Sequence, residues 1–297
     1  MKAVVFGGAG FVGSHVTDAL IEGGHDVTIF DRSKPSEMHD NARYVIGNTL
    51  DSDAVDSAIQ NQDIVYNFAG QPDIETGIED PIPTLQTNIL GCANQLESAR
   101  KAGVKRFVFA STVYVYSDAG GIYRVSKQSC ELMIEEYQRL YGLDYTIVRY
   151  GSLYGRRADK RNSVRRYLTQ ALTERKLTTT SGKDDQREYI HVSDAARSSV
   201  EILAEEFCNQ HVMLTGYQTI KVHDFLEMIR EIIGPDVQVE YEPTTDGDVL
   251  GHYARTPYSF RPKIGKKLVN HHYSDLGQGL LDCLDEIYQE QHESDDT

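Results

Sequence analysis

The sequence predicts an α/β fold, in which a doubly wound parallel sheet is joined to a smaller C-terminal α/β lobe. Short apolar runs of β type alternate with segments of helical periodicity over about the first 150 residues. This alternation is typical of a parallel sheet with helices on both faces. A glycine-rich turn follows the first apolar run, and Asp31 ends the second. The chain has 297 residues, which is enough to bury such a core and to build a second lobe.

The first half of the chain supplies the elements of the main sheet. Apolar runs of β-type residues predict the strands, and the amphipathic segments between them predict the helices. The helix that starts at residue 87 ends at Gly103, a residue type suited to helix C-termini. The expected strands are residues 2–6, 25–31, 43–47, 63–70, 106–112 and 145–151. The expected helices are residues 14–23, 53–60, 87–103 and 125–142.

The alternation loosens after about residue 150. Residues 161–176 and 221–234 have the periodicity of amphipathic helices. Residues 189–206 predict a strand and a helix that return to the main sheet. Residues 275–291 predict a C-terminal helix with an apolar stripe. The stripe comprises Leu276, Leu280, Leu284 and Ile287.

The composition excludes several classes of partner. The formal net charge is -15, from 45 acidic and 30 basic residues, and such a surface repels nucleic acid and anionic membranes. No apolar run approaches the ~20 residues that span a bilayer, and the first residues lack the apolar run of a signal peptide. Four cysteines, Cys92, Cys130, Cys208 and Cys283, have no paired spacing. We therefore expect a cytoplasmic protein with reduced thiols and no metal site, nucleic-acid partner or membrane partner.

The turn GGAGFVG carries Gly8, Gly10 and Gly13 in the pattern G-x-G-x-x-G, and Gly7 gives a second, overlapping register. Glycine is needed where the backbone turns tightly and where no side chain can block a pyrophosphate. The helix that follows offers free N–H groups and the positive end of its dipole. Because the motif follows a strand and opens a helix, it predicts dinucleotide binding.

Asp31 closes the second strand, 18 residues after Gly13. An acid at this place would accept hydrogen bonds from the adenosine ribose and would repel a 2′-phosphate, which favours NAD over NADP. Arg32, next to it, works against that preference, and Asp31 can also be read as a simple turn residue. We expect a Rossmann-type NAD-binding domain of residues 1–150 plus about 188–212. The remaining residues, about 151–187 and 213–297, are expected to form the substrate-binding lobe.

A Tyr-x-x-x-Lys pair occurs twice in the chain. Tyr217 and Lys221 lie in a segment with strand-like alternation, where their side chains would be roughly 13 Å apart. Tyr123 and Lys127 instead open a helical segment, where positions i and i+4 share a face with Cβ atoms about 5–6 Å apart. Only the second arrangement places an ammonium near a phenol.

These two side chains suit proton transfer beside a nicotinamide. A free tyrosine has a pKa near 10, and a nearby lysine and an oxidised nicotinamide both favour the phenolate. The phenolate can take a proton from a substrate hydroxyl while a hydride leaves the same carbon. Thr112 can hydrogen-bond that hydroxyl, and Asn88 can hold a water molecule or brace the backbone. The alternatives are structural: Thr112 ends a strand, Asn88 caps a helix and Lys127 is solvated.

Together these motifs resemble the extended short-chain dehydrogenase/reductase family, in its branch of NAD-dependent sugar-nucleotide epimerases and dehydratases. The resemblance covers nearly the whole chain and rests on the order of its motifs. They are GGAGFVG, Asp31, FAG at residues 68–70, TNILG, FASTVYVYS, YRVSK followed by Glu131, RYGSLYGRR and REYIHVSDAA. The resemblance implies a Rossmann domain with a small substrate lobe, and a homodimer paired through the helices that start near Asn88 and Tyr123.

The resemblance also implies a set of site residues. The catalytic residues would be Thr112, Tyr123 and Lys127, with Asn88 beside them. The NAD-binding residues would be Gly7, Gly10, Phe11, Val12, Gly13, Asp31, Arg32, Asn48, Thr49, Phe68, Ala69, Gly70, Tyr123, Lys127 and Tyr150. The residues that bind the nucleotide-sugar substrate would be Thr112, Ser152, Arg187, Arg156 and Arg157.

The residues after Thr112 favour one branch of this family. Dehydratases carry Asp-Glu there, decarboxylases usually keep an acid in the second slot, and some 3,5-epimerases have a cysteine in it. This chain has Val113 and Tyr114. Oxidation and re-reduction at a single carbon remains, which implies epimerisation at C4 through a transient 4-keto sugar. A 4-ketoreductase or dehydrogenase of the same fold, and a non-enzymatic dinucleotide-sensing module, are the alternatives.

Several positions depart from the family pattern. Ser152 stands where an asparagine is frequent, Thr245 where an arginine is common, and Asn48 where an aspartate is common near the adenine. The interval from Thr112 to Tyr123 is short, whereas Arg187 matches a residue that often touches the substrate nucleotide.

Residues 156–166 carry six basic side chains against Asp159 alone. In an acidic chain, this segment could bind a substrate phosphate. A solvated helix face or a salt-bridge patch between subunits explains it equally well.

Overall fold

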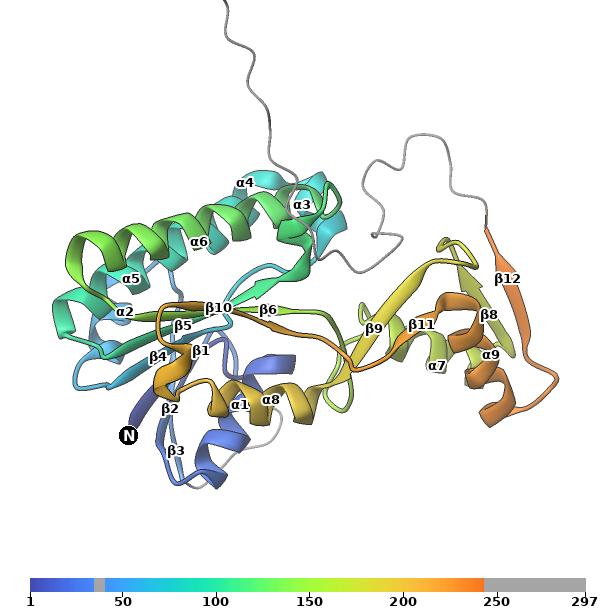
Figure 1. Cartoon of the computed structure of the whole chain (residues 1–297), viewed down its shortest axis with the longest axis horizontal. Helices are drawn as coiled ribbons and strands as arrows, with labels where there is room; N and C mark the ends of the chain where they lie inside the picture. The colour runs from blue at the N-terminus through green and yellow to red at the C-terminus, as the bar shows by residue number, and fades with distance from the viewer. Residues whose placement is uncertain (35–40, 243–297) are drawn as a thin grey trace, which may run out of the picture. The chain divides into compact units, whose positions relative to one another are not determined.

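The computed structural model describes residues 1–34 and 41–242. Its main sheet has seven parallel strands in the order β10-β6-β5-β4-β1-β2-β3 (Figure 1). Their bounds are β1 Lys2–Phe6, β2 Asp26–Asp31, β3 Ala42–Ile46, β4 Ile64–Asn67, β5 Arg106–Thr112, β6 Tyr145–Tyr150 and β10 Gln210–Leu214. The strand order reverses where β1 lies between β2 and β4, and in such sheets ligands bind at this point. The predicted α/β fold class is confirmed.

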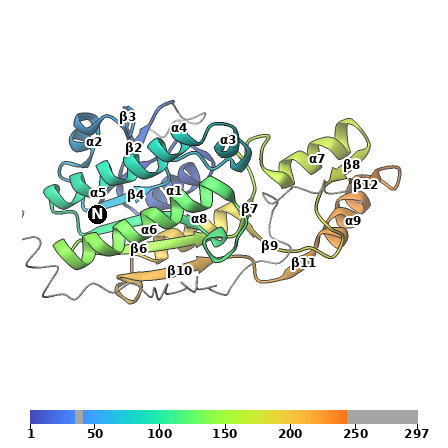
Figure 2. The ribbon, with the colours of Figure 1, turned by 90° about the horizontal axis from the view of Figure 1, so that it is seen from above.

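The central strands are apolar because helices cover the sheet on both faces. In β1, residues Ala3 to Phe6 are fully buried. On one face lie α1 (Phe11–Glu22) and α8 (Val192–Glu201), which contribute Val16 and Ala195 to the core. The other face is covered by α2 (Ser52–Ile59), α5 (Gly91–Ala102) and α6 (Gly121–Tyr141). Figure 2 shows α5 and α6 side by side along this face.

Short helical segments connect these elements, at the carboxyl ends of the strands except for η3, which leads into the start of β10. They are α3 (Ile74–Glu79), α4 (Pro81–Leu85), the π-helical η1 (Gln86–Leu90), and the 3₁₀ helices η2 (Val113–Tyr116) and η3 (Glu205–Phe207). The η1 segment leads directly into α5, and η2 follows β5 without a gap. Consequently, Asn88 and Thr112 lie at junctions rather than inside regular elements.

The later part of the described chain forms two small sheets and a separate core. One sheet has the order β11-β9-β7 and the other pairs β12 with β8. The strands are β7 Ser152–Tyr154, β8 Lys176–Thr179, β9 Gln186–His191, β11 Thr219–Lys221 and β12 Gln238–Tyr241. The helices α7 (Ser163–Thr173) and α9 (Val222–Ile233) bury Tyr167, Leu177, Leu226 and Ile229 between them and these strands.

One element is placed differently from the prediction. The strand expected to return to the main sheet is β9, but it lies in the three-stranded sheet, and β10 pairs with β6 instead. The reason is visible in β9 itself, because Arg187 and Glu188 are buried there and Glu188 accepts a hydrogen bond from Thr219 of the neighbouring β11. Because a buried polar group needs a hydrogen-bond partner, this bond favours the pairing of β9 with β11. The helix that follows, α8, does pack on the main sheet.

The remaining expectations about organisation are not tested by this structure. The C-terminal helix at residues 275–291 and Thr245 lie outside the described residues. The domain boundaries stay a prediction. Within residues 1–34 and 41–242, no helix has the length and apolar character that a bilayer crossing requires.

Candidate active site

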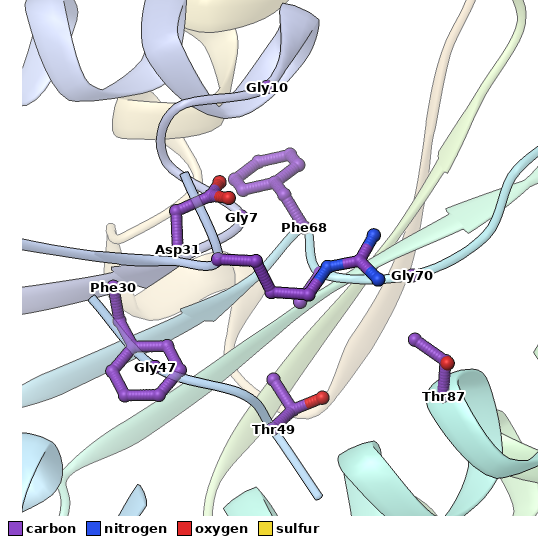
Figure 3. A pocket seen from close by; sticks show the side chains of 11 residues that line it. Gly7, Gly10, Phe30, Asp31, Gly47, Thr49, Phe68, Gly70 and Thr87 are labelled. Carbon is purple, nitrogen blue, oxygen red and sulfur yellow. The ribbon is translucent and has the colours of Figure 1, made fainter. Parts of the chain in front are cut away.

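A pocket lies at the carboxyl ends of the central strands (Figure 3). Its walls come from the loops after β1, β2, β3 and β4 and from η1, so it occupies the point where the strand order reverses. The lining residues are Gly7, Gly10, Phe30, Asp31, Arg32, Gly47, Thr49, Phe68, Ala69, Gly70 and Thr87.

The glycines of the first turn are required by the backbone. Gly7 has φ +76°, and a Cβ added to it would lie 2.6 Å from the Ala69 nitrogen. A Cβ on Gly13 would lie 2.2 Å from the Gly7 carbonyl oxygen. The N-cap of α1 is Gly10, which provides no side-chain hydrogen bond, so the first N–H groups of the helix stay available to a ligand. This cradle fits a pyrophosphate, with Phe11 and Val12 supplying backbone N–H groups.

Asp31 joins the second strand to the glycine turn. Its Oδ2 accepts a hydrogen bond of 3.0 Å from the Ala9 N–H, and its Oδ1 accepts one of 3.2 Å from the Ser33 N–H. The carboxylate also lines the pocket, beside the turn that carries Gly7 and Gly10 (Figure 3). Asp31 therefore holds the turn and also lines the pocket. The two interpretations of Asp31, as a turn residue and as a residue that faces a ligand, are compatible.

Two neighbouring residues after β3 are placed differently. Thr49 is buried, lines the pocket and receives a hydrogen bond from Asn94 to its carbonyl oxygen. Asn48 is exposed and is not among the lining residues, because its side chain accepts a hydrogen bond of 3.1 Å from the Leu50 N–H at the start of the turn into α2. A contact between Asn48 and an adenine stays a prediction.

Three lining residues were missed by the sequence prediction. Phe30 packs against Gly47, where an added Cβ would lie 2.5 Å from the aromatic ring. Thr87 lines the opposite wall from the π-helical turn. Phe30 and Thr87 each precede a residue that was singled out, so the available signal was adjacency along the chain. Gly47 also precedes a singled-out residue, Asn48, but its need for glycine comes from the ring of a different strand and is not visible in its own segment.

The structure brings Thr112, Tyr123 and Lys127 together where β5 ends and α6 begins. The Tyr123 hydroxyl hydrogen-bonds the Thr112 side chain. The Lys127 ammonium lies 5.8 Å from the centre of the Tyr123 ring and donates a hydrogen bond of 2.8 Å to the Ala110 carbonyl oxygen. Lys127 is 6% exposed, so it is held in place rather than solvated.

Burial governs the pKa values of this group. Burial raises the pKa of Tyr123 to about 12, although the hydrogen bond with Thr112 acts in the opposite direction. The pKa of Lys127 is lowered by burial, against the effect of nearby Cys130, Cys92 and Glu131. The expectation that Lys127 and an oxidised nicotinamide together favour the phenolate stays a prediction. The protein groups by themselves keep Tyr123 protonated at neutral pH.

Asn88 braces the loop that follows β4. It is 4% exposed, its Oδ1 accepts a hydrogen bond of 2.7 Å from the Gln71 N–H, and its Nδ2 donates to the Gln71 carbonyl oxygen and to Ser126 Oγ. A Cβ on Gly70 would lie 2.9 Å from the Asn88 Oδ1. The side chain thus joins the pocket wall at Gly70 to the first turns of α6.

Tyr150 and Ser152 follow one another around the end of β6. The Tyr150 hydroxyl lies 2.6 Å from Ser199 Oγ of α8, and its ring is tilted against Phe68 at 6.1 Å. Tyr150 is not among the lining residues, so it supports the pocket wall from behind, and its direct contact with a cofactor stays a prediction. Ser152 is half-buried in β7, where it pairs with Tyr189 of β9.

The basic residues after β7 are used in different ways. Arg157 forms an ion pair of 2.6 Å with Asp18 of α1, and His15 of the same helix contacts the Arg156 carbonyl oxygen at 3.0 Å. Both contacts fasten this loop to α1. Arg187 is 6% exposed in β9, with a guanidinium nitrogen 3.7 Å from the Asp185 carboxylate. None of these three arginines lines the pocket, so their roles toward a substrate stay predictions.

The model of the NAD dependent epimerase/dehydratase family matches residues 3–214. This span includes every strand of the main sheet, the glycine turn and the group formed by Thr112, Tyr123 and Lys127. The chain belongs to this family. The resemblance found in the sequence is thereby confirmed, and so is NAD as the cofactor of the fold.

Two relatives show the range of activities near this family member. A Methanocaldococcus jannaschii protein provisionally named UDP-glucose 4-epimerase is 29% identical over 84% of this chain and 88% of the relative. The UDP-glucuronic acid decarboxylase 1 of Arabidopsis thaliana is 27% identical over 90% of this chain and 64% of its own length. Both epimerases and decarboxylases are therefore similar to the family member described here.

Two solved structures of UDP-glucose 4-epimerases are also similar to this chain. The UDP-glucose 4-epimerase of Thermotoga maritima with UDP-glucose has a TM-score of 0.79 and 27% identity, over 88% of this chain and 90% of that one. The Thermus thermophilus UDP-glucose 4-epimerase in complex with NAD has a TM-score of 0.77 and 26% identity, over 90% and 95%.

Proposed function

We propose that the protein is an NAD-dependent epimerase of a nucleotide-activated sugar that acts at C4 through a transient 4-keto intermediate. The observation that carries this proposal is the Tyr123 hydroxyl, bonded to Thr112 one helical turn from the buried Lys127. The similarity to UDP-glucose 4-epimerases over nearly the whole chain supports it.

In this proposal, the chain's residues handle the proton and hold the sugar hydroxyl. NAD, when bound to the glycine turn, accepts a hydride from the sugar carbon and later returns it. Thr112 hydrogen-bonds the C4 hydroxyl, and Tyr123 takes its proton. Because burial raises the pKa of the phenol to about 12, Tyr123 needs positive charge nearby before it can act as a base. Lys127 supplies part of that charge and would hold the nicotinamide ribose.

The residues after Thr112 separate this activity from others. Val113 is buried and Tyr114 packs edge-on against Tyr123, with ring centres 6.5 Å apart, so neither place carries an acid. The two carboxylic acids that dehydratases of this family carry there are therefore missing from these positions. Oxidation and re-reduction at one carbon needs Tyr123 alone.

A second candidate is the decarboxylation of a nucleotide-activated uronic acid, which the similarity to UDP-glucuronic acid decarboxylases favours. Oxidation of such a sugar at C4 gives a β-keto acid, whose C5–C6 bond then breaks with release of carbon dioxide. The enolate that remains must take a proton at C5, and this chain has Tyr114 in the slot where decarboxylases usually keep an acid. The protein groups required up to the oxidation are the same, so the substrate decides between the two outcomes.

We assign substrate phosphate binding to Arg187 and the neighbourhood of Ser152, with Arg156 as a further contact. The ion pair with Asp18 makes Arg157 a weaker candidate. Residues 1–150 plus about 188–212 would bind NAD, and the rest would bind the sugar. A cytoplasmic location belongs to the same proposal and is consistent with the free thiols of Cys92, Cys130 and Cys208.

The proposal includes a homodimer paired through α5 and α6. Along this pair of helices and the turn before them, Leu90, Leu132, Leu140 and Tyr141 are each more than half exposed. Four large apolar side chains on adjacent helices fit a self-complementary interface between two copies. Light scattering of the purified protein would give the mass of a dimer, and a monomer at micromolar concentration would contradict this part.

The test of function is a panel of UDP-sugars that includes UDP-glucose, UDP-galactose and UDP-glucuronic acid. Proton NMR should show conversion of one sugar to its C4 epimer, without net change in absorbance at 340 nm. Release of carbon dioxide from UDP-glucuronic acid would select the decarboxylase. Stoichiometric consumption of the cofactor would select a ketoreductase or dehydrogenase, and full function in Tyr123→Phe would select a dinucleotide sensor.

A further inference from the structure

A buried carboxylate lies behind the catalytic group and takes no part in the mechanism above. Glu131 is 6% exposed on α6, one helical turn after Lys127 and two turns after Tyr123. One of its oxygens accepts a hydrogen bond from the Ser111 hydroxyl, and Ser111 directly precedes Thr112 on β5. Glu131 therefore connects the helix that carries Tyr123 and Lys127 with the strand that carries Thr112.

Arg149 of β6 completes the arrangement around this carboxylate. Its Nε and Nη2 donate to the two oxygens of Glu131 at 3.1 and 2.7 Å, a bidentate pair that compensates a buried charge. Its Nη1 donates to the Tyr116 hydroxyl, and its guanidinium lies 4.6 Å from the centre of the Tyr116 ring. Tyr116 ends the 3₁₀ turn η2 that follows Thr112, so Arg149 holds the other side of Thr112.

The ion pair of Glu131 and Arg149 makes a contact on each side of Thr112. Ser111 binds Glu131 before Thr112, and Tyr116 binds Arg149 after it. Other side-chain bonds also hold this turn: the Tyr114 N–H donates to Thr112 Oγ1 at 3.3 Å, Ser117 Oγ donates to the Tyr114 carbonyl oxygen, and Gln128 Nε2 donates to the Val115 carbonyl oxygen at 3.0 Å. A change in the position of Glu131 would therefore move Thr112 relative to Tyr123.

We propose that Glu131 is a positioning residue of the active site, which acts through Ser111 and through Arg149 to set Thr112 against Tyr123. This rests on the proposed function for its catalytic consequence. The proton transfer depends on the position of Thr112 relative to Tyr123, because a shift of about 1 Å between reacting groups can lower a rate by about 100-fold.

Glu131 has a second, electrostatic effect on the same site. Its negative charge raises the pKa of Lys127, which burial lowers. Removal of the charge would lower the pKa of Lys127 further, so the ammonium would lose its proton at a lower pH. The positional and the electrostatic effects can therefore be separated, because Ser111 carries no charge.

The decisive variants are Ser111→Ala and Glu131→Gln. Ser111→Ala removes only the bond to the strand and leaves the pair of Glu131 and Arg149 intact. We expect kcat on the active sugar to fall about 10- to 100-fold in both variants, with KM and the Kd for NAD within about twofold. The alkaline limb of the pH–rate profile should move to lower pH in Glu131→Gln alone. Ser111→Thr, which restores the hydroxyl, should recover most of kcat.

The matched control is Glu136→Gln on the same helix. Glu136 is exposed and pairs with Arg139, far from the strand, so its variant should keep the wild-type kcat and pH profile. Wild-type kcat in both Ser111→Ala and Glu131→Gln would overturn the proposal. So would a loss of kcat in Ser111→Ala that Ser111→Thr does not reverse.

Hydrogen–deuterium exchange tests the positioning without any activity. Peptides that cover residues 111–116 should exchange faster in Ser111→Ala and Glu131→Gln than in wild type or Glu136→Gln. Unchanged exchange there, or an increase spread over the whole main sheet, would overturn the proposal. If the wild-type protein converts none of the nucleotide sugars, the proposed function fails, and the exchange measurement still decides whether Glu131 positions the turn.

Discussion

At the ends of β1 and β2 the candidate site is formed mainly by backbone, whereas at the end of β5 and the start of α6 it is formed by side chains. The nucleotide end consists of glycines that approach one another so closely that a Cβ would collide. The proton-transfer end consists of Thr112, Tyr123 and Lys127, which are held by hydrogen bonds; Thr112 and Lys127 are buried and Tyr123 is half-buried. The first end shapes a surface for a ligand, and the second fixes the distances between reacting groups.

This difference predicts how substitutions divide. Changes at the nucleotide end should alter affinity for NAD and leave the proton-transfer groups in place. Changes to Thr112 and Tyr123 should alter turnover and leave NAD affinity nearly unchanged, whereas a change to Lys127, which would also hold the nicotinamide ribose, should alter both. A substitution that failed to follow this division would show that the two ends are coupled.

The largest effect is expected for Tyr123→Phe. The phenyl ring can keep its packing against Tyr114, but the hydroxyl that transfers the proton is lost. We expect kcat to fall about 1,000-fold, with the Kd for NAD within about twofold, measured by steady-state kinetics and calorimetry. Tyr217→Phe is the matched control, because Tyr217 also precedes a lysine by four residues but is fully exposed. Near-normal turnover in Tyr123→Phe would remove this residue from the mechanism.

The next effect is expected for Gly13→Ala at the nucleotide end. An added Cβ at this position would lie 2.2 Å from the Gly7 carbonyl oxygen and 3.0 Å from the Gly8 Cα. Because these atoms belong to the backbone, the turn must shift. Overpacking of this kind costs about 1–3 kcal/mol, and the Kd for NAD should rise about 10- to 100-fold. Gly24→Ala is the control, since Gly24 has φ +76° in open space. Both variants should lower Tm, but only Gly13→Ala should weaken NAD binding. Equal NAD affinity in the two variants would contradict the proposal that the glycine turn holds the pyrophosphate.

A smaller effect is expected for Asp31→Ala. The carboxylate lines the pocket and also holds the Ala9 N–H, so its removal should weaken binding of NAD about tenfold more than binding of NADP. Titration of the two dinucleotides by intrinsic fluorescence would measure the ratio. Asp26→Ala, at the exposed start of the same strand, should change neither. An equal loss for both dinucleotides would leave Asp31 with a purely structural role.

The smallest effect concerns alkaline stability at the proton-transfer end. Because the pKa of Tyr123 is raised from 10.0 to about 12, the folded protein keeps the phenolic proton where the unfolded chain loses it. The contribution of Tyr123 is complete below pH 10 and falls by up to about 1.4 kcal/mol per pH unit above it. Urea unfolding at pH 8 and pH 11 should therefore show a smaller loss of stability in Tyr123→Phe than in wild type. The same loss in both proteins would refute the burial of the hydroxyl.

The sequence predicted those features that depend on local order along the chain. The glycine turn, Asp31 and the strands around them follow from patterns within about 30 residues, and all lie where they were expected. The close approach of Tyr123 and Lys127 followed from helical spacing alone. These are features whose physical cause is contained in one segment.

The features that were missed have causes in two segments. Gly47 must be glycine because of the ring of Phe30, and Arg157 turns to Asp18 because α1 lies beside its loop. The pKa of Tyr123 is raised to about 12 because burial, which one sequence does not report, outweighs the opposite effect of the hydrogen bond with Thr112. The strand β9 was misplaced because its partner strands, β7 and β11, lie outside its own segment, and nothing within that segment shows which sheet it joins.

The π-helical turn at Gln86–Leu90 has a consequence for deletions in this stretch of the chain. A π turn holds one residue more than an α turn, and deletion of that residue would rotate all of α5 by about 100° relative to the preceding helix. Asn88 would leave the loop at Gln71, and the buried face of α5 would turn outward. The number of residues in this stretch therefore matters to the fold as much as their identity. A single-residue deletion here would disturb both the loop at Gln71 and the packing of α5.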